Sequence, residues 1–154
     1  MATYTKQLQK IVADYRKAGM AGPAPAKAIA EWAVQEGRWQ LPPAAVTQRC
    51  AEDISRAMRE EYMTDPQGRR VRVKHPVTRT IDGEQYVLWD DIRTAPRTHM
   101  QMAFQQRRLG IVGDCRQLKT DVDSYNDSRP ENSPIQMIFD FTMDLAELEA
   151  ARAA

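Results

Sequence analysis

Residues 67–81 constrain the fold of this chain more than any other stretch. They include five basic side chains and no acidic one: Arg69, Arg70, Arg72, Lys74 and Arg79. Val71 and Val73 alternate with charged residues at the two-residue period of a β-strand. Asp82-Gly83 supplies a turn, and residues 86–90 supply a β-rich return strand. The pattern therefore predicts a basic β-hairpin.

Two amphipathic helices are predicted at the beginning of the chain. The first covers about residues 3–18 and ends at Gly19, because glycine favours the position just beyond a helix. The second begins at Pro25, which suits a first helical turn, and stops at Gly37. Both helices carry apolar residues at spacings of three and four, so each is expected to bury one face.

A third helix is predicted from about Pro43 until residues 65–68 end it. Its apolar face carries Val46, Cys50, Ile54, Met58 and Tyr62. Three helices followed by a hairpin have the element order of a winged helix-turn-helix. We therefore expect a mainly α fold with a small β-hairpin, in which residues 1–92 form a winged-helix domain.

A long helix is predicted from just after Pro96 to about Asn126. Its apolar residues repeat at alternating spacings of four and three, with Arg108 as one interruption: Phe104, Ile111, Cys115, Leu118, Val122 and Tyr125. Such a repeat predicts packing on another helix, either in a second copy of the chain or in the chain's own C-terminal segment. Gly110 and Gly113 leave two alternatives, a break in the helix or the close approach of a neighbouring backbone.

The C-terminal segment allows two structures. Its apolar residues alternate as in a strand, at Ile135, Met137, Phe139, Phe141 and Met143. Ser133-Pro134, however, fits the start of a helix that would continue through Leu148. We favour a short strand followed by a helix capped by Thr142. The segment is too apolar to stay unpacked, so residues 93–154 are expected to form a helical oligomerisation and packing appendage, closed on its own domain or exchanged with a neighbour.

The charge of the chain is uneven although its net value is only +1. Basic residues gather in the hairpin and again from Arg93 to Lys119, where Asp114 is the only acidic residue. A net negative balance is confined to the tail, residues 128–154, which hold five acidic and two basic residues. A net charge this small argues against a protein that coats nucleic acid with its whole surface, and favours local basic patches.

The motifs of common enzymes and metal sites are missing from the sequence. His75 and His99 do not lie at a metal-ligand spacing, and His75 is expected to be a surface turn residue before Pro76. Neither a phosphate-binding glycine loop, a zinc-protease helix nor a nucleophile elbow occurs. We therefore expect no catalytic residue, no metal and no cofactor.

Cysteine usage and hydropathy favour a cytoplasmic location. Cys50 and Cys115 fall on apolar helix faces, and both are expected to be buried and reduced. The sequence has no secretory leader and no long uncharged apolar run, so no contact with a membrane is expected.

Three stretches together resemble the HARE-HTH winged-helix domains. They are residues 28–39 (AIAEWAVQEGRW), residues 50–54 (CAEDI) and residues 86–89 (YVLW). In that family a second helix of the form IAE…A…G-W leads to a third helix with an inner DI pair and then to a hairpin. The resemblance covers about residues 4–92 and implies a DNA- or chromatin-associated module without catalytic residues. The core positions that it implies are Ile29, Trp39, Ile54, Tyr86 and Leu88.

These features favour a non-enzymatic protein that binds double-stranded DNA, as a dimeric regulator or accessory factor. The basic residues of the hairpin would neutralise phosphates: Arg69, Arg70, Arg72, Lys74 and Arg79. The exposed face of the third helix would approach the groove, since Gln and Arg side chains fit purine edges: Gln48, Arg49, Arg56 and Arg59.

Two other functions remain open. The chain could be a protein-interaction module in which the same hairpin and the long-helix repeat bind a protein partner. It could also be a regulator that responds to a small molecule, with a pocket between the long helix and residues 137–148. DNA binding is the leading hypothesis, and these two functions are its alternatives.

Overall fold

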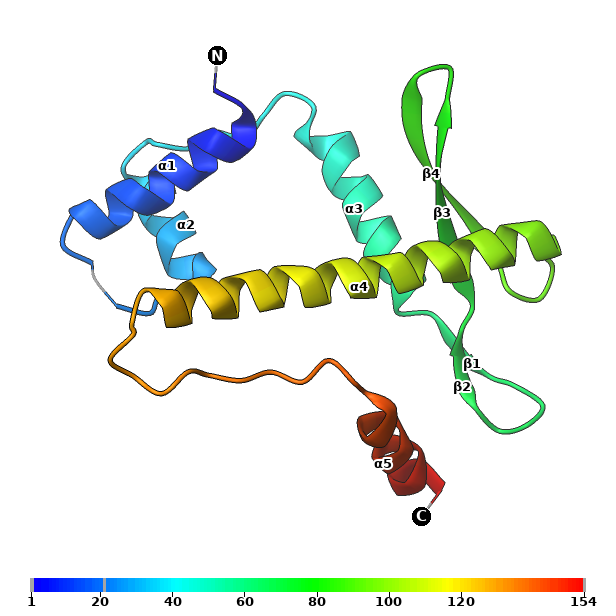
Figure 1. Ribbon diagram of the computed structural model, residues 1–154. Coiled ribbons are helices and arrows are strands. Elements are labelled where there is room, and N and C mark those ends of the chain that lie inside the picture. The colour runs from blue at the N-terminus through cyan, green and yellow to red at the C-terminus, as the bar shows by residue number, and fades with distance from the viewer. Residues whose placement is uncertain (1, 21, 154) are drawn as a thin grey trace. The chain divides into compact units, whose positions relative to one another are not determined.

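The structure is a computed structural model that describes residues 2–20 and 22–153. It is mainly helical with two small antiparallel β-hairpins, as the sequence predicts (Figure 1). The chain divides into two compact units, Met1–Ser55 (unit 1) and Arg56–Ala154 (unit 2), and each is described here by itself. The boundary lies inside the third helix and not near residue 92, so a winged-helix domain over residues 1–92 stays a prediction.

Unit 1 contains α1 (Tyr4–Lys17), α2 (Ala26–Gln35) and most of α3 (Ala45–Arg59). The three predicted helices are thereby confirmed. Gly19 and Gly37 adopt the left-handed conformation, with φ of 94° and 65°, just beyond α1 and α2. Glycine adopts this conformation without the steric cost of a Cβ, which explains why the helices end where the sequence predicts.

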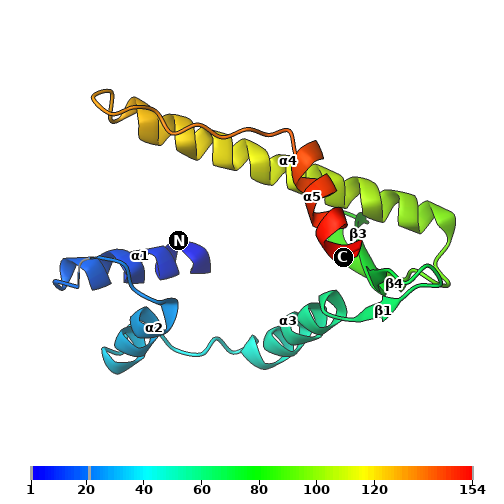
Figure 2. The same ribbon diagram turned by 90° about the horizontal axis from the view of Figure 1, so that it is seen from below.

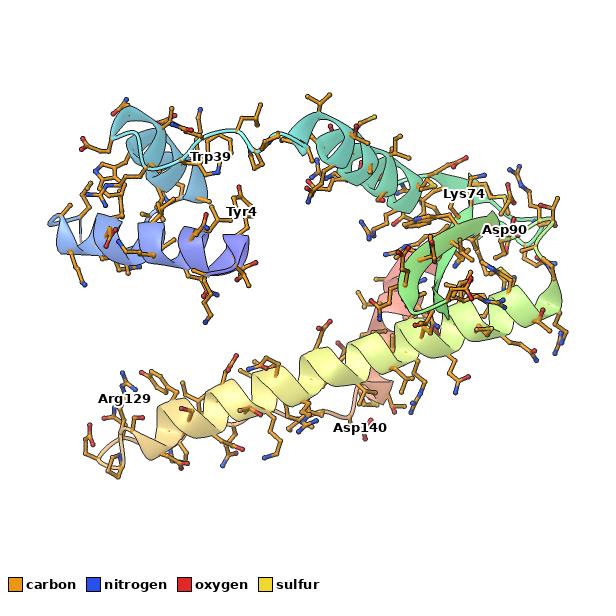
Figure 3. The ribbon with its side chains drawn as sticks, turned by 90° about the horizontal axis from the view of Figure 1, so that it is seen from above. Tyr4, Trp39, Lys74, Asp90, Arg129 and Asp140 are labelled. Atoms are coloured by element: carbon orange, nitrogen blue, oxygen red, sulfur yellow. The ribbon has the colours of Figure 1, made fainter. Side chains whose placement is uncertain are left out.

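The first two helices pack through aromatic and charged side chains. The rings of Tyr15 and Trp32 meet edge to face, with centroids 5.5 Å apart. The Arg38 guanidinium lies over the Trp32 ring and pairs with Asp14 at 2.8 Å. Trp39 donates a 2.8 Å hydrogen bond from Nε1 to the Tyr4 hydroxyl, and Figure 3 shows these two side chains facing one another. These contacts fix the chain after α2 against α1.

The predicted basic hairpin is confirmed in part, as the pair β3 (Lys74–Ile81) and β4 (Glu84–Asp91), whereas residues 67–73 of the predicted arm precede β3. Ile81 pairs with Glu84, so the loop holds only Asp82 and Gly83. Both loop residues have positive φ, 50° and 81°, as a type I′ turn requires. An Asp-Gly pair suits this turn because both residue types tolerate positive φ.

The sequence did not predict a second, smaller hairpin formed by β1 (Tyr62–Thr64) and β2 (Arg70–Arg72). The prediction that Tyr62 ends the apolar face of the third helix is wrong, because α3 stops at Arg59. Asp65 organises the turn between the two strands. Its carboxylate accepts from the backbone N–H groups of Gln67 and Arg69 and from Arg69 Nε. Residues 65–68, which the sequence predicts to end the third helix, therefore belong to the loop of the β1–β2 hairpin.

Val73 joins the two hairpins. Its N–H donates to the carbonyl of Glu61, and its carbonyl accepts from the N–H of Ile92, at 3.0 and 2.8 Å. Val73 is buried, and the extended arm that contains it pairs with β1 before this residue and with β4 after it. The basic stretch is thus one arm that changes its pairing partner at Val73.

The long helix α4 (Arg97–Asp127) packs its first half on β3. Ala103 is buried there beside the hairpin. The side-chain amide of Gln106 donates to the carbonyl of Thr78 and accepts from the N–H of Thr78, at 2.9 and 2.8 Å. His99 Nε2 lies 2.9 Å from the His75 carbonyl. Two polar clamps and one small buried side chain therefore hold α4 to the hairpin.

The second half of α4 continues without interruption past Gly110 and Gly113. The predicted long helix is confirmed, and the alternative of a break at these glycines is wrong. An added Cβ at either position would meet nothing within 4 Å, so neither glycine is needed for a close contact. Their cost in helix propensity is outweighed by the helical residues on both sides.

After α4 the chain turns, and residues 133–141 run back along the helix without regular secondary structure (Figures 1 and 2). The Asn126 side chain holds this segment by donating to the carbonyl of Ile135 and accepting from its N–H, both at 2.9 Å. Helix α5 (Thr142–Ala153) follows. The expected strand over residues 135–143 is wrong. The helix does begin at Thr142, but Asp140 supplies the capping carboxylate, which accepts from the N–H and hydroxyl of Thr142.

Burial is sparse in the part of the chain that the structure describes. The buried apolar residues are Tyr15, Ala33, Val73, Val77 and Ala103. The prediction that both cysteines are buried is wrong, because Cys50 is exposed and Cys115 is half-buried. Of the core positions implied by the resemblance, Ile29 and Trp39 are half-buried, whereas Ile54, Tyr86 and Leu88 are exposed. The apolar helix and strand faces from which this burial was predicted exist, but their side chains remain exposed to solvent.

Candidate nucleic-acid interface

A basic cavity lies in unit 2 where the hairpins meet the end of α3 and the first half of α4. Its volume is about 280 Å³, and it is lined by Arg59, Arg72, Lys74, His75, Pro76, Thr78, Trp89, Ala103, Gln106 and Arg107. Four of these side chains are cationic and none is acidic. Figure 3 shows the neighbourhood, with Lys74 and Asp90 on the hairpin beside the first half of α4.

Each of the four cationic side chains of the cavity comes from a different helix or strand. Arg59 comes from the last turn of α3 and lies over the Trp89 ring, 5.4 Å from its centroid. Arg72 ends β2 and Lys74 begins β3, so these two flank the Val73 junction. Arg107 follows Gln106, whose amide is fixed to Thr78. The cavity therefore depends on the packing of the hairpins against α4.

His75 forms the floor of this region. It is 5% exposed, its Nε2 lies 2.8 Å from the Arg72 carbonyl, and its ring meets the edge of Phe104 at a centroid distance of 5.4 Å. The expectation that His75 is a surface turn residue is wrong. Pro76 lies within strand β3 and not in a turn. A proline is tolerated there because the N–H that it lacks would face away from β4 and take no part in the β3–β4 pairing.

One carboxylate borders the cavity and partly neutralises it. Asp91 accepts from Arg93 and, at 3.3 Å, from Lys74. Its hydrogen bonds with the Arg93 side chain and backbone hold the pKa of Asp91 well below its ordinary value. Asp91 is therefore charged at neutral pH and shares its charge between Arg93 and Lys74, which leaves Arg59, Arg72 and Arg107 as the dominant cations.

The structure places the other predicted hairpin residues outside the cavity. Arg69 pairs with Asp65 at 2.7 Å, and hydrogen bonds from Arg69, first its backbone N–H, lower the pKa of Asp65. The Arg70 guanidinium lies over the Tyr62 ring, 4.2 Å from its centroid. Arg79 points toward the sulfur of Met102 at 3.5 Å. Of the five hairpin cations predicted, the cavity thus brings together Arg72 and Lys74.

Two of the four predicted groove-reading residues of α3 have hydrogen-bond partners within their own helix. Gln48 donates to Glu52 at 3.5 Å, and Arg49 pairs with Asp53 at 3.1 Å. Arg56 is exposed, and Arg59 contributes to the cavity. Exposed pairs one helical turn apart are weak, so they fix these side chains only loosely.

Sequence reasoning missed Arg107, Trp89 and Gln106 as members of this site. The cluster of basic residues between Arg93 and Lys119 was a signal for Arg107. It could not distinguish Arg107 from Arg108, because the choice depends on which face of α4 meets β3.

The predicted oligomerisation residues lie along α4. Phe104 touches His75, and it is exposed on its other side, as are Ile111, Leu118 and Tyr125. Cys115 and Val122 are half-buried. Beside Val122, residues 134–139 and α4 border a shallow hollow of about 430 Å³, close to where a small-molecule pocket was considered.

Within residues 2–20 and 22–153, no three His, Cys, Asp or Glu side chains are grouped so that they could hold a metal ion. None of the described helices is both long and apolar enough to cross a bilayer. Comparison of the chain with protein-family models, with curated proteins and with solved structures gave no match.

Proposed function

We propose that this chain is a non-enzymatic, double-stranded DNA-binding protein of the winged-helix type. The observation that carries the proposal is the cavity that presents Arg59, Arg72, Lys74 and Arg107 without a lining carboxylate. Phosphate groups are the anions that such a cluster suits, because guanidinium groups donate to two oxygens at once. In this proposal the basic arm of residues 67–81 acts as the wing. Arg69, Arg70 and Arg79 then contact phosphates of the DNA backbone on either side of the cavity.

The stacking of Arg59 on Trp89 supports a phosphate role for this side chain. A guanidinium over an aromatic ring keeps its N–H groups directed outward in its own plane. The indole face of Trp89 orients the Arg59 guanidinium and leaves its positive charge in place, whereas a carboxylate partner would neutralise that charge. Arg59 is thus positioned before a ligand arrives, which lowers the entropy lost on binding.

The winged-helix assignment rests on complementary apolar surfaces in unit 1. α1 and α2 border a groove of about 310 Å³ whose lining is apolar, and the apolar face of α3 bears Val46 and Ile54, 77% and 52% exposed. In a winged helix the third helix packs on the first two. Closure of this groove by α3 would bury both surfaces and direct Gln48, Arg49 and Arg56 outward, toward a DNA groove.

Fluorescence anisotropy with a labelled random duplex, titrated at about 50 and about 200 mM salt, tests the proposal. Binding should fall steeply with salt, because each neutralised phosphate releases counterions. The double variant Arg72→Ala with Arg107→Ala should bind every duplex more weakly and reduce the slope of log K against log salt by about 1.8, for two lost phosphate contacts.

The matched control is Lys6→Ala with Lys17→Ala on α1, which lowers the net charge equally but leaves the cavity unchanged. It should retain the wild-type slope. If wild-type protein does not bind at low salt, the DNA proposal is wrong. If both double variants lose the same slope, binding follows overall charge and the cavity is not the site.

A protein-interaction module is the second candidate, and one observation favours it. Large apolar side chains of α4 and the C-terminal segment are uncovered, among them Ile138 at 82% exposure and Met143 at 71%. Exposed apolar surface of this extent usually marks a contact with another macromolecule. Salt-insensitive association with a protein, without binding to DNA, would favour this candidate.

A further inference from the structure

Unit 2 buries too little apolar surface for its length. Among its described residues the buried apolar side chains are Val73, Val77 and Ala103, and all three lie near the hairpins. Beside Val122 in the second half of α4 lies the extended segment 134–139, which borders a shallow hollow with the helix. Helices in water are stabilised mainly by packing of an apolar face, so this half of α4 needs a further partner.

We propose that the partner is the α4 helix of a second copy of this chain, packed antiparallel along the seam. The seam is the set of residues at alternating spacings of four and three: Phe104, Ile111, Cys115, Leu118, Val122 and Tyr125. At 1.5 Å per residue it extends for roughly 32 Å, long enough for a two-stranded coiled coil. This inference does not depend on DNA binding.

The seam is free to pair while α4 stays docked on its own hairpin. His99, Ala103 and Gln106 face β3. At 3.6 residues per turn these three positions point roughly 115° around α4 from the mean direction of the seam, and the two faces adjoin at Phe104, which touches His75. A second copy can therefore approach the turns from Ile111 onward, beyond the docked region, without displacing the hairpin.

Charge selects the antiparallel orientation. From Arg97 to Lys119 the helix has five basic residues against Asp114, whereas the stretch from Thr120 to its end has three acidic residues and no basic one. A parallel pair would place like charges together along the whole helix. An antiparallel pair places the basic half of each copy beside the acidic half of the other, which is favourable and self-complementary.

One register of the two antiparallel α4 helices brings their apolar seam residues face to face. With Leu118 facing the partner's Cys115, Ile111 faces the partner's Val122, and every apolar seam residue in the central turns is covered. In this register the acidic end of α4, residues 121–127, lies level with partner residues 106–112, whose charged side chains are both basic. In a parallel pair these two stretches do not meet.

The C-terminal segment extends the same surface. Asn126 holds Ile135 in place, and residues 134–139 lie beside Val122 at the border of the seam. Ile135 and Met137 are each 49% exposed there. A second helix on the seam would cover part of this segment as well, which explains how an apolar stretch without regular structure can be retained in a protein exposed to water.

Sedimentation equilibrium of the full chain without DNA, over a range of concentrations, tests the proposal. Wild-type protein should sediment as a dimer. Leu118→Glu should raise the dimer Kd at least about a hundredfold, because it places two charges in the interface. Leu109→Glu is the matched control, since Leu109 is similarly exposed, at 57% against 44% for Leu118, but lies away from the seam. Hydrogen exchange of the Thr78 amide, which Gln106 holds, should stay slow in both variants and so report that the docked half of α4 remains folded.

Cross-linking tests the orientation. In a background of C50S and C115S, the double variant I111C/V122C should form a disulfide between two copies on mild oxidation, whereas I111C alone should not, because the antiparallel register places position 111 opposite the partner's position 122 and far from the partner's position 111. A wild-type monomer at all concentrations would overturn the proposal, and so would an L118E variant that stays dimeric. Cross-linking of the I111C single variant, or no cross-linking of I111C/V122C, would overturn the antiparallel arrangement. Because no DNA is present, none of these outcomes bears on the basic cavity.

Discussion

The two halves of α4 are held by different kinds of contact. The first half is docked on β3 by buried Ala103, by the Gln106 amide and by His99. The second half is accompanied by an extended segment that one side chain, Asn126, fixes through two hydrogen bonds. The difference teaches that one continuous helix can be docked by buried and hydrogen-bonded contacts at one end while large apolar side chains stay exposed at the other.

This contrast also separates the two proposed activities. The docked half supplies Arg107 to the basic cavity, where cations must be held in place to bind phosphate. The other half carries most of the seam, whose apolar residues remain available for a second copy. Variants in one half should therefore leave the function of the other half largely unchanged.

The largest expected effect comes from the core beneath the docked half. Val77 is 1% exposed, and Val77→Ala should lower the free energy of unfolding of unit 2 by about 2 kcal/mol, from lost burial and a residual cavity. Urea unfolding followed by circular dichroism measures this change. Val87→Ala on the partner strand is the control, because Val87 is 55% exposed and should cost far less. Equal losses would show that the hairpin is not packed against α4.

A smaller effect is expected from the clamp between α4 and β3. Gln106→Ala removes two hydrogen bonds to the Thr78 backbone and should cost about 1 to 2 kcal/mol. Hydrogen exchange should show faster exchange of the Thr78 amide. Gln105→Ala, one position along the exposed helix surface, should leave that amide protected. An unchanged Thr78 amide in the first variant would contradict the docking geometry.

The hairpin should respond to acid through Asp91. Its pKa is lowered in the folded protein by hydrogen bonds from Arg93 and Lys74, so the carboxylate stabilises the fold at pH values above its ordinary pKa of about 4. This contribution is lost as the pH falls through the lowered folded pKa. Asp91→Asn should therefore be less stable than wild type at neutral pH, and the difference in urea midpoint should shrink below about pH 4. A difference independent of pH would exclude ionisation as its cause.

The smallest effect on global stability is expected in the second half of α4. Asn126→Ala should cost less than about 1 kcal/mol, because water can replace the amide at an exposed site. Its local effect should be clear, with loss of exchange protection at the Ile135 amide. If global stability falls as much as in Gln106→Ala, the two halves do not differ in the way that their contacts indicate.

Local patterns in the sequence were sufficient for most elements. The glycines after α1 and α2 and the Asp82-Gly83 turn depend on backbone conformation that each residue dictates itself, and they were predicted correctly. The β1–β2 hairpin was missed because Tyr62 continued a helical spacing while Asp65 formed a loop from backbone hydrogen bonds. The spacing of apolar residues cannot show whether a segment becomes helix or strand when pairing with another strand decides between the two.

The site was predictable only in part, for a related reason. A run of basic residues indicated Arg72 and Lys74, but their separation from Arg69 and Arg70 follows from the change of pairing at Val73. Burial of His75 and exposure of Cys50 likewise depend on contacts between elements distant in sequence. The winged-helix arrangement and the DNA-binding activity stay predictions.

The clamp on Thr78 also has a consequence for the solubility of the protein. Strands at the edge of a sheet can recruit further strands and start aggregation. On the outer side of β3, Pro76 offers no N–H, and Gln106 occupies both backbone groups of Thr78. An incoming strand therefore finds no backbone donor at either position and an acceptor already in use at Thr78, so a glutamine on a helix makes this edge a poorer template for a further strand.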